Sequence, residues 1–258
     1  MVKILRLSDS DDIGEVADAQ RGYRVVERVF AEATGEAVET FVRVVWPSPA
    51  LPGLIDGWIT RYEPDLVIFK VNGYWFVYRS LPLQIRRRLG LVGRPLGRAG
   101  QWAASRRWLS RRRAFKAARG LLVRRLGGAH YFETAEVIET MTECVRTIAR
   151  HEQIGIVVRT PIIGWLELPY LTGRQRDEMR SRLALVEAAA ASLCASTHAI
   201  HVGRDPYGPP LPLGDIYEAD GLHLNVEAQE WYARKEAGAL AVAWRAQRGE
   251  RSRRSERL

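Results

Sequence analysis

The stretch Val2-Lys3-Ile4-Leu5-Arg6-Leu7-Ser8-Asp9-Ser10-Asp11-Asp12 decides the fold, because a short apolar run gives way in it to a polar turn. The run Val2–Leu7 predicts a buried strand. Helical spacing of apolar residues follows over Arg21–Ala33. A strand, a turn and a helix in this order form the opening unit of an α/β fold.

The alternation of strand and helix continues over the rest of the chain. Four more strands are predicted, over Ala37–Trp46, Asp65–Val71, Ile154–Arg159 and Ala199–Val202. Four more helices are predicted, over Leu54–Tyr62, Thr134–His151, Arg174–Ala195 and, capped by Asn225, a segment that ends near Trp244. Such alternation implies parallel strands joined by right-handed crossovers. We therefore predict a three-layer α/β/α sandwich with a five-stranded, flavodoxin-like parallel sheet and a site at the carboxyl ends of its strands.

The length and composition allow one large α/β domain or two small ones. The chain has 258 residues, of which 47% are hydrophobic, and we assign residues 1–248 to a single domain. The charged residues 249–258 are predicted to form a disordered tail. The sequence begins without the pattern of a signal peptide, and its apolar runs are shorter than the roughly 20 residues that span a bilayer. The expected location is the cytoplasm, with peripheral attachment to a membrane left open.

Cys144 and Cys194 both fall in predicted helices. Neither belongs to a Cys-x-x-Cys pair or stands near clustered histidines. We therefore expect two buried free thiols, and we expect neither a metal nor a cofactor.

The positive charge of the chain is concentrated in one segment. Between Arg79 and Gly128 there are fifteen Lys or Arg residues and no Asp or Glu, which exceeds the net charge of +9 of the whole chain. Apolar residues, among them Trp102, Trp108 and Phe115, are interleaved with the arginines and predict at least one amphipathic helix inserted into the domain. Three roles stay open for this basic insertion: a lid over the site, a surface for anionic lipid, or a nucleic-acid patch. Nucleic acid is the least favoured, because the rest of the chain is acidic.

Ser10 stands in the turn after the first strand, where backbone N–H groups at the start of the next helix can stabilise an oxyanion. A serine hydroxyl becomes an effective nucleophile when a base removes its proton. The segment Asp220-Gly221-Leu222-His223 offers such a base, since a carboxylate can bond one imidazole nitrogen and leave the other to accept a proton. Alone, each motif is more often structural, as a helix cap or a buried polar pair. Together they favour nucleophilic catalysis.

These motifs resemble the sequence blocks of the SGNH (GDSL-type) serine hydrolase family. Ile4–Gly14 is similar to the first block, an apolar strand followed by G-D-S-x-x-x-G, with Ser8 in place of the first glycine. Asp220–Asn225 is similar to the last block, D-G-x-H-x-N. Pro64–Phe69 resembles the strand that leads to the third block, G-x-N-D. Outside the basic insertion, the resemblance covers most of the chain.

The resemblance implies an ester hydrolase. In that family's terms Ser10 is the nucleophile, His223 is the general base and Asp220 orients His223. The implied substrate is a small-molecule or lipid ester whose acyl group the sequence leaves open.

The oxyanion hole is where this chain departs from the family pattern. Trp46-Pro47-Ser48-Pro49 stands where the second block has its glycine, and Gly53 is the nearest substitute. In the third block Asn72 is the asparagine available as a donor, although strict alignment from the strand places Tyr74 at that position. The predicted hole therefore consists of the Ser10 N–H, the Asn72 side chain and Gly53. Loss of one such donor typically lowers the rate on the order of a hundredfold to a thousandfold.

Two other functions stay open. One is a magnesium-dependent phosphotransferase similar to the haloacid-dehalogenase group, with Asp9 as nucleophile, Asp215 and Asp220 as the acidic block and Lys70 in support. It leaves His223 without a role. The other is a binding protein built on an SGNH scaffold with impaired catalysis, which acts through the basic insertion.

Overall fold

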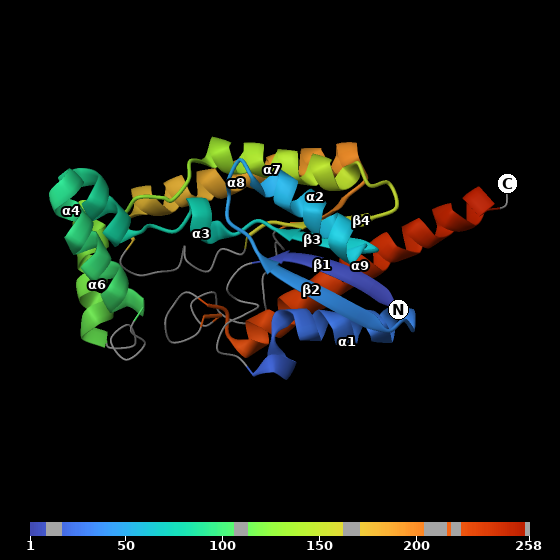
Figure 1. Ribbon diagram of the computed structural model, residues 1–258. Helices are drawn as coiled ribbons and strands as arrows, with labels where there is room; N and C mark the ends of the chain where they lie inside the picture. The colour runs from blue at the N-terminus through green and yellow to red at the C-terminus, as the bar shows by residue number, and fades with distance from the viewer. Residues whose placement is uncertain (9–16, 106–112, 162–170, 204–215, 218–222, 256–258) are drawn as a thin grey trace.

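The computed structural model describes residues 1–8, 17–105, 113–161, 171–203, 216–217 and 223–255 (Figure 1). Within these residues, five strands form one parallel sheet. The strands are β1 (Val2–Ser8), β2 (Val38–Val44), β3 (Leu66–Lys70), β4 (Gly155–Arg159) and β5 (Ile200–Val202). Their spatial order is β2-β1-β3-β4-β5, which confirms the predicted flavodoxin-like sheet.

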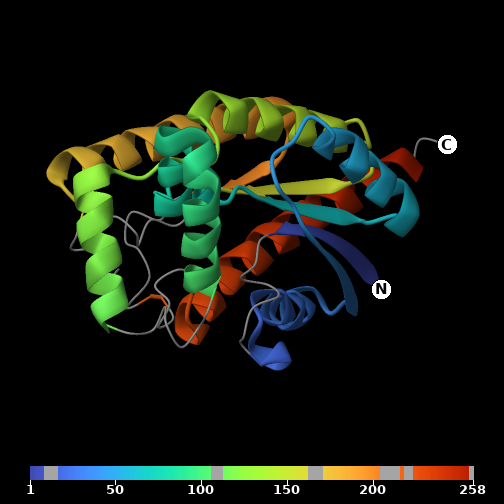
Figure 2. The same ribbon diagram turned by 60° about the vertical axis from the view of Figure 1, so that its left-hand side comes forward.

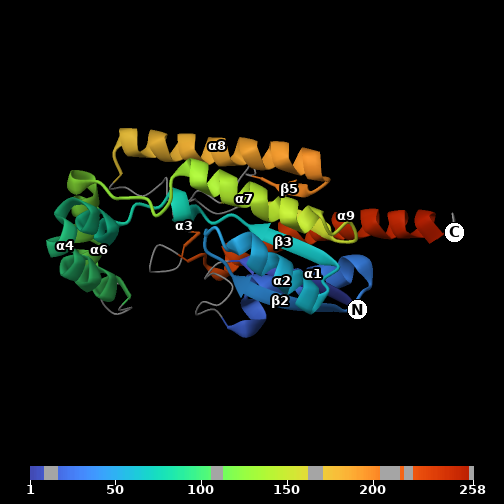
Figure 3. The ribbon, with the colours of Figure 1, turned by 45° about the horizontal axis from the view of Figure 1, so that its top comes forward.

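Helices cover both faces of the sheet and make three layers, as predicted (Figures 1 and 3). A short 3-10 turn, η2 (Asp18–Gln20), leads into α1 (Gly22–Thr34), which packs with α9 (Val226–Ser255) on one face. The other face is covered by α2 (Leu51–Tyr62), α7 (Thr134–Ala149) and α8 (Gly173–Thr197). Cys144 lies in α7 and Cys194 in α8, and both are buried free thiols, as expected.

The alternation of side chains along each strand divides the apolar core in two. On β3, Val67 and Phe69 join the core beneath α2, α7 and α8, whereas Leu66 and Ile68 join the core beneath α1 and α9. Period-two alternation places successive side chains on opposite faces of the sheet. On the α1–α9 face, the apolar series gives way at the carboxyl end to Lys70, which is buried.

The basic insertion lies outside the sheet, as predicted, and most of its described residues are helical. After the short α3 (Gly73–Phe76), the insertion forms α4 (Leu81–Ser105) and α6 (Arg113–Leu126), which contact each other. We call α4 and α6 the basic hairpin. It stands at the end of the molecule where the parallel strands finish, away from the C-terminus (Figures 1 and 2). No helix among the described residues combines the length and apolar character needed to cross a membrane.

The last helix differs from its prediction. It runs to Ser255 rather than ending near Trp244, so residues 249–255 are helical instead of forming the predicted disordered tail; residues 256–258 lie outside the described part of the chain. Two polar contacts are made just beyond Trp244. Gln247 donates to the Gln153 carbonyl at 2.6 Å, and Arg248 forms an ion pair with Glu36 at 2.7 Å. These contacts hold the helix beyond the apolar repeat from which its end was predicted.

Candidate functional site

Three segments that the sequence predicts to carry the site meet at the carboxyl edge of the sheet. β1 ends at the buried Ser8, and β3 ends at Lys70, two residues before Asn72. His223 directly precedes Leu224, which lines a small cavity together with Lys70 and with Arg159 at the end of β4. The segment before α9 therefore lies at the same edge as the ends of these strands.

Of the predicted triad, the described residues contain only His223. Ser10 and Asp220 lie outside the described part of the chain, as do Asp9 and Asp215 of the alternative phosphotransferase scheme. His223 is half-buried.

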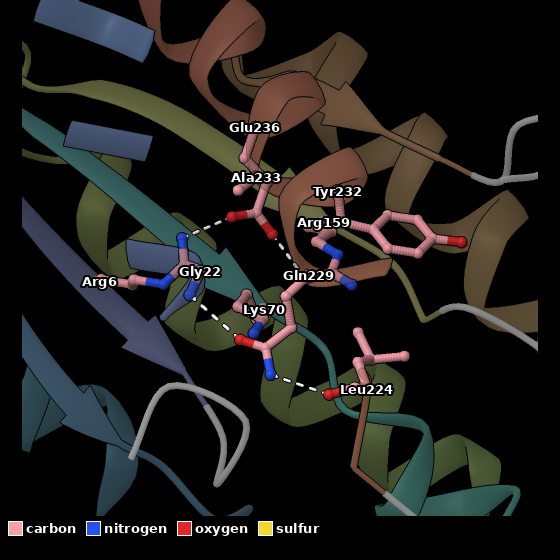
Figure 4. A pocket seen from close by; sticks show the side chains of 9 residues that line it. All are labelled: Arg6, Gly22, Lys70, Arg159, Leu224, Gln229, Tyr232, Ala233 and Glu236. Atoms are coloured by element: carbon pink, nitrogen blue, oxygen red, sulfur yellow. Dashed lines mark hydrogen bonds and ion pairs between the residues drawn. The ribbon is translucent and has the colours of Figure 1, made fainter. Parts of the chain in front are cut away.

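The N-terminus of α9 fixes the backbone beside His223. Asn225 caps the helix as predicted, with its Oδ1 accepting from the Ala228 N–H at 2.9 Å. Gln229 donates its side-chain amide to the Leu224 carbonyl at 2.9 Å and accepts from the Gly22 N–H at 3.2 Å (Figure 4). One glutamine thus joins the residue after His223 to the start of α1, the helix that follows the Ser10 segment.

A buried ionic cluster holds β1, β4 and α9 together behind this edge (Figure 4). Glu236 of α9 accepts from Arg6 at 2.6 Å through one carboxylate oxygen and from Arg159 at 2.5 Å through the other. All three side chains are buried, with Glu236 exposing 1% of its side chain. Lys70 and Tyr232 line the same cavity, whose volume of about 10 Å³ has room for roughly one water molecule.

The cluster affects the acidity of its aromatic neighbour. Arg159 lies over the ring of Tyr232 at 4.9 Å from the centroid. Burial has the larger effect on the pKa of the Tyr232 hydroxyl and raises it to about 12, although the positive charge of Arg159 lowers this pKa. Tyr232 therefore stays protonated at neutral pH.

Asn72 has a defined capping role in the structure. It is the N-cap of α3, and its Oδ1 accepts from the Tyr74 N–H at 2.8 Å. Because a side-chain amide has one acceptor end and one donor end, this cap commits the oxygen to the backbone and leaves the NH₂ group as the end that can serve a ligand. The side chain itself is half-buried.

Tyr74, the alternative third-block residue, belongs to an aromatic cluster. Its ring stacks on Tyr78 at 4.6 Å and on Tyr131 at 5.1 Å, and its hydroxyl lies 3.1 Å from the Tyr131 hydroxyl. Burial, together with that hydrogen bond, raises the pKa of the Tyr74 hydroxyl above its usual range. The Tyr74 hydroxyl is therefore engaged with Tyr131.

Trp46 closes this aromatic cluster on the side of β2. Its ring makes edge contacts with Tyr131 at 5.4 Å and Phe132 at 5.6 Å, and it lies tilted to Tyr74 at 6.2 Å. The indole remains 45% exposed. Where the SGNH second block has a glycine, this chain therefore presents an aromatic side chain to solvent.

Gly53, the predicted substitute for that glycine, lies in the first turn of α2 and is exposed. A Cβ built at this position would meet no atom within 4 Å. Neither close packing nor backbone conformation therefore requires glycine here among the described residues.

Sequence reasoning missed two features of the edge. The aromatic cluster joins Tyr131 and Phe132 to Tyr74 across the basic insertion, and no periodicity signals such a long-range contact. The ionic cluster left a weak signal, since Arg6, Lys70 and Arg159 each stand within or at the end of an otherwise apolar strand. Lys70 and Arg159 are paired across β3 and β4, and the buried Arg6 and Arg159 share one acidic partner, Glu236.

Comparison with known proteins bears on the fold. No family model and no curated protein sequence matches the chain. Among solved structures, TesA has a TM-score of 0.50 at 11% identity, over 91% of this chain and 99% of TesA. Est24, a carbohydrate acetylesterase from Sinorhizobium meliloti, has a TM-score of 0.50 at 12% identity, over 94% of this chain and 99% of that chain. The chain therefore has the SGNH hydrolase fold that its sequence blocks predict.

Proposed function

We propose that this protein is a serine hydrolase that cleaves an ester, with Ser10 as nucleophile, His223 as general base and Asp220 as the residue that orients His223. The observation that carries the proposal is the meeting of three segments at one edge of the sheet. Arg6 of β1, Lys70 at the end of β3 and Leu224 beside His223 line one cavity there. In the sequence, the Ser10 segment follows β1 and Asn72 follows β3.

The proposed chemistry proceeds in two stages. His223 accepts the Ser10 proton while Ser10 Oγ attacks the ester carbonyl carbon, and the tetrahedral oxyanion is stabilised by N–H donors. Collapse expels the alcohol, which takes the proton from His223, and leaves an acyl-enzyme. Water then attacks the acyl carbon with His223 again as base, the bond to Ser10 Oγ breaks, and His223 returns the proton to Ser10 as the acid is released.

The donors proposed for the oxyanion are the Ser10 N–H, the Asn72 NH₂ group and Gly53. Asn72 is the best supported of them, because its cap directs the oxygen of the amide to Tyr74. For Gly53 the support is its place in the first turn of α2, where backbone N–H groups have no carbonyl of the same helix four residues earlier to accept them. The proposed substrate is a small-molecule or lipid ester.

Labelling with a fluorophosphonate probe tests the proposal, since the probe reacts with an activated serine hydroxyl. We expect the wild-type protein to be labelled and to hydrolyse p-nitrophenyl acetate. Ser10→Ala should abolish both, and His223→Gln should lower both by several orders of magnitude. Ser181→Ala removes an exposed serine hydroxyl on α8 and serves as the matched control with full labelling.

Persistent labelling of the Ser10→Ala variant would refute the nucleophile. The phosphotransferase alternative makes the opposite demands. It requires magnesium for turnover of p-nitrophenyl phosphate and loss of that turnover in Asp9→Asn, with Ser10→Ala still active.

A further inference from the structure

We propose that the basic hairpin is a docking surface for an anionic lipid bilayer, and that the outward face of α6 is the part that enters the lipid interface. This proposal concerns a partner and does not depend on whether the protein hydrolyses esters.

The outward face of α6 is exposed and mostly apolar, and Arg125 shares it at the C-terminal end. Its members recur at helical spacing and are Ala114, Ala117, Ala118, Leu121 and Leu122. Leu121 is 51% exposed and Leu122 is 43% exposed, whereas the opposite side of the helix carries the buried Gly120 and Val123. The helix therefore has two apolar sides: one faces the protein and the other faces solvent.

The basic hairpin also exposes arginines. On α6 they are Arg124 and Arg125, and on α4 they are Arg86, Arg87, Arg88 and Arg98. Two further large apolar side chains of α4 are exposed among them, Leu89 at 50% and Trp102 at 57%. Because the insertion contains no acidic residue, all of its formal charge has one sign.

Charge and apolar surface together select the occupant. A nucleic acid would satisfy the arginines but would leave the exposed leucines of α6 in water. An acidic protein surface would need apolar residues placed to match. A bilayer with anionic headgroups offers both, since headgroups attract basic side chains and the layer beneath them accepts leucine and tryptophan.

The base of the hairpin is fixed to the domain, so docking would orient the whole molecule. Ser80 and Ala129 exchange two backbone hydrogen bonds, of 2.9 and 3.1 Å. Gly128 packs so closely on Arg79 that a Cβ there would lie 2.5 Å from the Arg79 Cβ, so the close approach requires glycine. A further contact joins the hairpin to the domain: Arg119 of α6 lies over the ring of Tyr78, with its guanidinium carbon 5.2 Å from the ring centroid.

The anchored hairpin stands at the end of the molecule where the strands finish (Figures 1 and 2). A bilayer held by it would therefore lie on the side of the candidate site rather than behind it. This step rests on the proposed function, and it names esters carried in a lipid interface as the substrate class.

Sedimentation with vesicles tests the docking. We expect the full-length protein to sediment with phosphatidylcholine vesicles that contain phosphatidylserine, and to stay in solution with phosphatidylcholine alone or at high salt. The double variant Arg124→Gln/Arg125→Gln should lower the partition coefficient about thirtyfold, the factor expected for two basic residues at an anionic surface. Leu121→Gln/Leu122→Gln should lower it at least tenfold.

Matched controls come from α8, where Leu185 is 58% exposed and Arg180 is exposed. Leu185→Gln and Arg180→Gln should leave sedimentation unchanged. Equal binding to neutral and anionic vesicles, or binding that the α6 variants do not weaken, overturns the proposal. If the protein binds a fluorescent oligonucleotide but neither kind of vesicle, the lipid proposal is wrong and nucleic acid is the partner.

Activity separates this inference from the proposed function. Leu121→Gln/Leu122→Gln should reduce hydrolysis of a long-chain p-nitrophenyl ester held in anionic vesicles and leave hydrolysis of soluble p-nitrophenyl acetate unchanged. Vesicle binding without hydrolysis of either ester would refute the proposed function alone. Hydrolysis of the acetate without vesicle binding would refute the docking alone.

Discussion

Asn72 caps α3 by accepting the Tyr74 N–H at 2.8 Å, and the two residues thereby have separate tasks although either can be aligned with the same position of the SGNH third block. The asparagine turns its NH₂ end away from the backbone, while the tyrosine turns its hydroxyl to Tyr131. Substitutions that separate capping from hydrogen-bond donation can therefore distinguish an oxyanion donor from a structural residue.

Asn72→Ser should keep the cap and lose the donor. A serine at an N-cap accepts a backbone N–H about as well as asparagine does, but its hydroxyl is shorter than the amide. We expect little change in the free energy of unfolding, with kcat lowered on the order of a hundredfold to a thousandfold and KM nearly unchanged. Denaturant unfolding and steady-state kinetics on p-nitrophenyl acetate measure the two effects. An unchanged kcat would remove Asn72 from the oxyanion hole.

Tyr74→Phe makes the complementary change. It removes the hydroxyl that pairs with Tyr131 and keeps the stacked ring, so we expect a loss of about 1 kcal/mol in the free energy of unfolding. The esterase kcat should stay within about twofold of wild type, since less than half a kcal/mol separates such rates. A loss of activity as large as that expected for Asn72→Ser would reassign the donor to Tyr74.

Glu236→Gln should be strongly destabilising, because it removes the carboxylate that both Arg6 and Arg159 contact in the buried cluster. Breaking a buried ion pair from one side typically costs about 3–5 kcal/mol. Glu230→Gln is the control on the same helix, since its pairs with Arg28 and Arg234 are exposed and are expected to contribute less than about 1 kcal/mol. Equal effects of the two substitutions on urea midpoints would contradict the proposed importance of the cluster.

His130 makes stability depend on pH at the base of the basic hairpin. Burial, followed by the charges of Arg182 and Arg79, lowers the pKa of His130 from 6.5 to about 4, against the opposing effect of Glu178. The unfolded chain therefore binds the proton more readily than the folded protein. The free energy of unfolding is therefore unaffected by His130 above pH 6.5, where the ring is neutral in both states. It falls between pH 6.5 and about 4, where the unfolded chain binds the proton and the folded protein does not.

The expected size of this effect is a loss of about 2 kcal/mol in the free energy of unfolding between pH 7 and pH 5. The His130→Gln variant should lack that portion of the loss. Glu178 adds a separate effect at lower pH, since Arg79 and His130 hold the pKa of its carboxyl below the usual range although burial opposes them. Urea unfolding at several pH values measures the difference, and parallel curves for variant and wild type would contradict it.

The sequence was sufficient for the sheet because the strands are short apolar runs with clear boundaries. Each predicted strand overlaps an observed one, and the parallel order followed from the helices between them. The end of α9 was missed for a physical reason. Apolar periodicity reports where a helix touches the core, whereas beyond Trp244 this helix is held by polar contacts of Gln247 and Arg248.

The candidate site could be predicted only where a polar residue suited to catalysis stands close to the end of a predicted strand or the start of a predicted helix. Asn72 and His223 stand directly beside elements of regular structure, and their placement at the carboxyl edge follows from the topology. The aromatic cluster could not be foreseen, because Tyr74 and Tyr131 are 57 positions apart in the sequence. The position of Ser10 and Asp220 relative to His223 stays a prediction.

The ion pair between Arg6 and Glu236 joins residues 230 positions apart, from the first strand and the last helix. During synthesis β1 emerges early, yet the carboxylate that its buried arginine contacts and the helix that covers its face are made only when α9 appears. The face of the sheet beneath α1 and α9 must therefore remain incomplete through most of translation. We expect a ribosome-bound chain lacking α9 to be sensitive to protease, and its partial sheet to be a natural client for chaperones that shield exposed apolar strands.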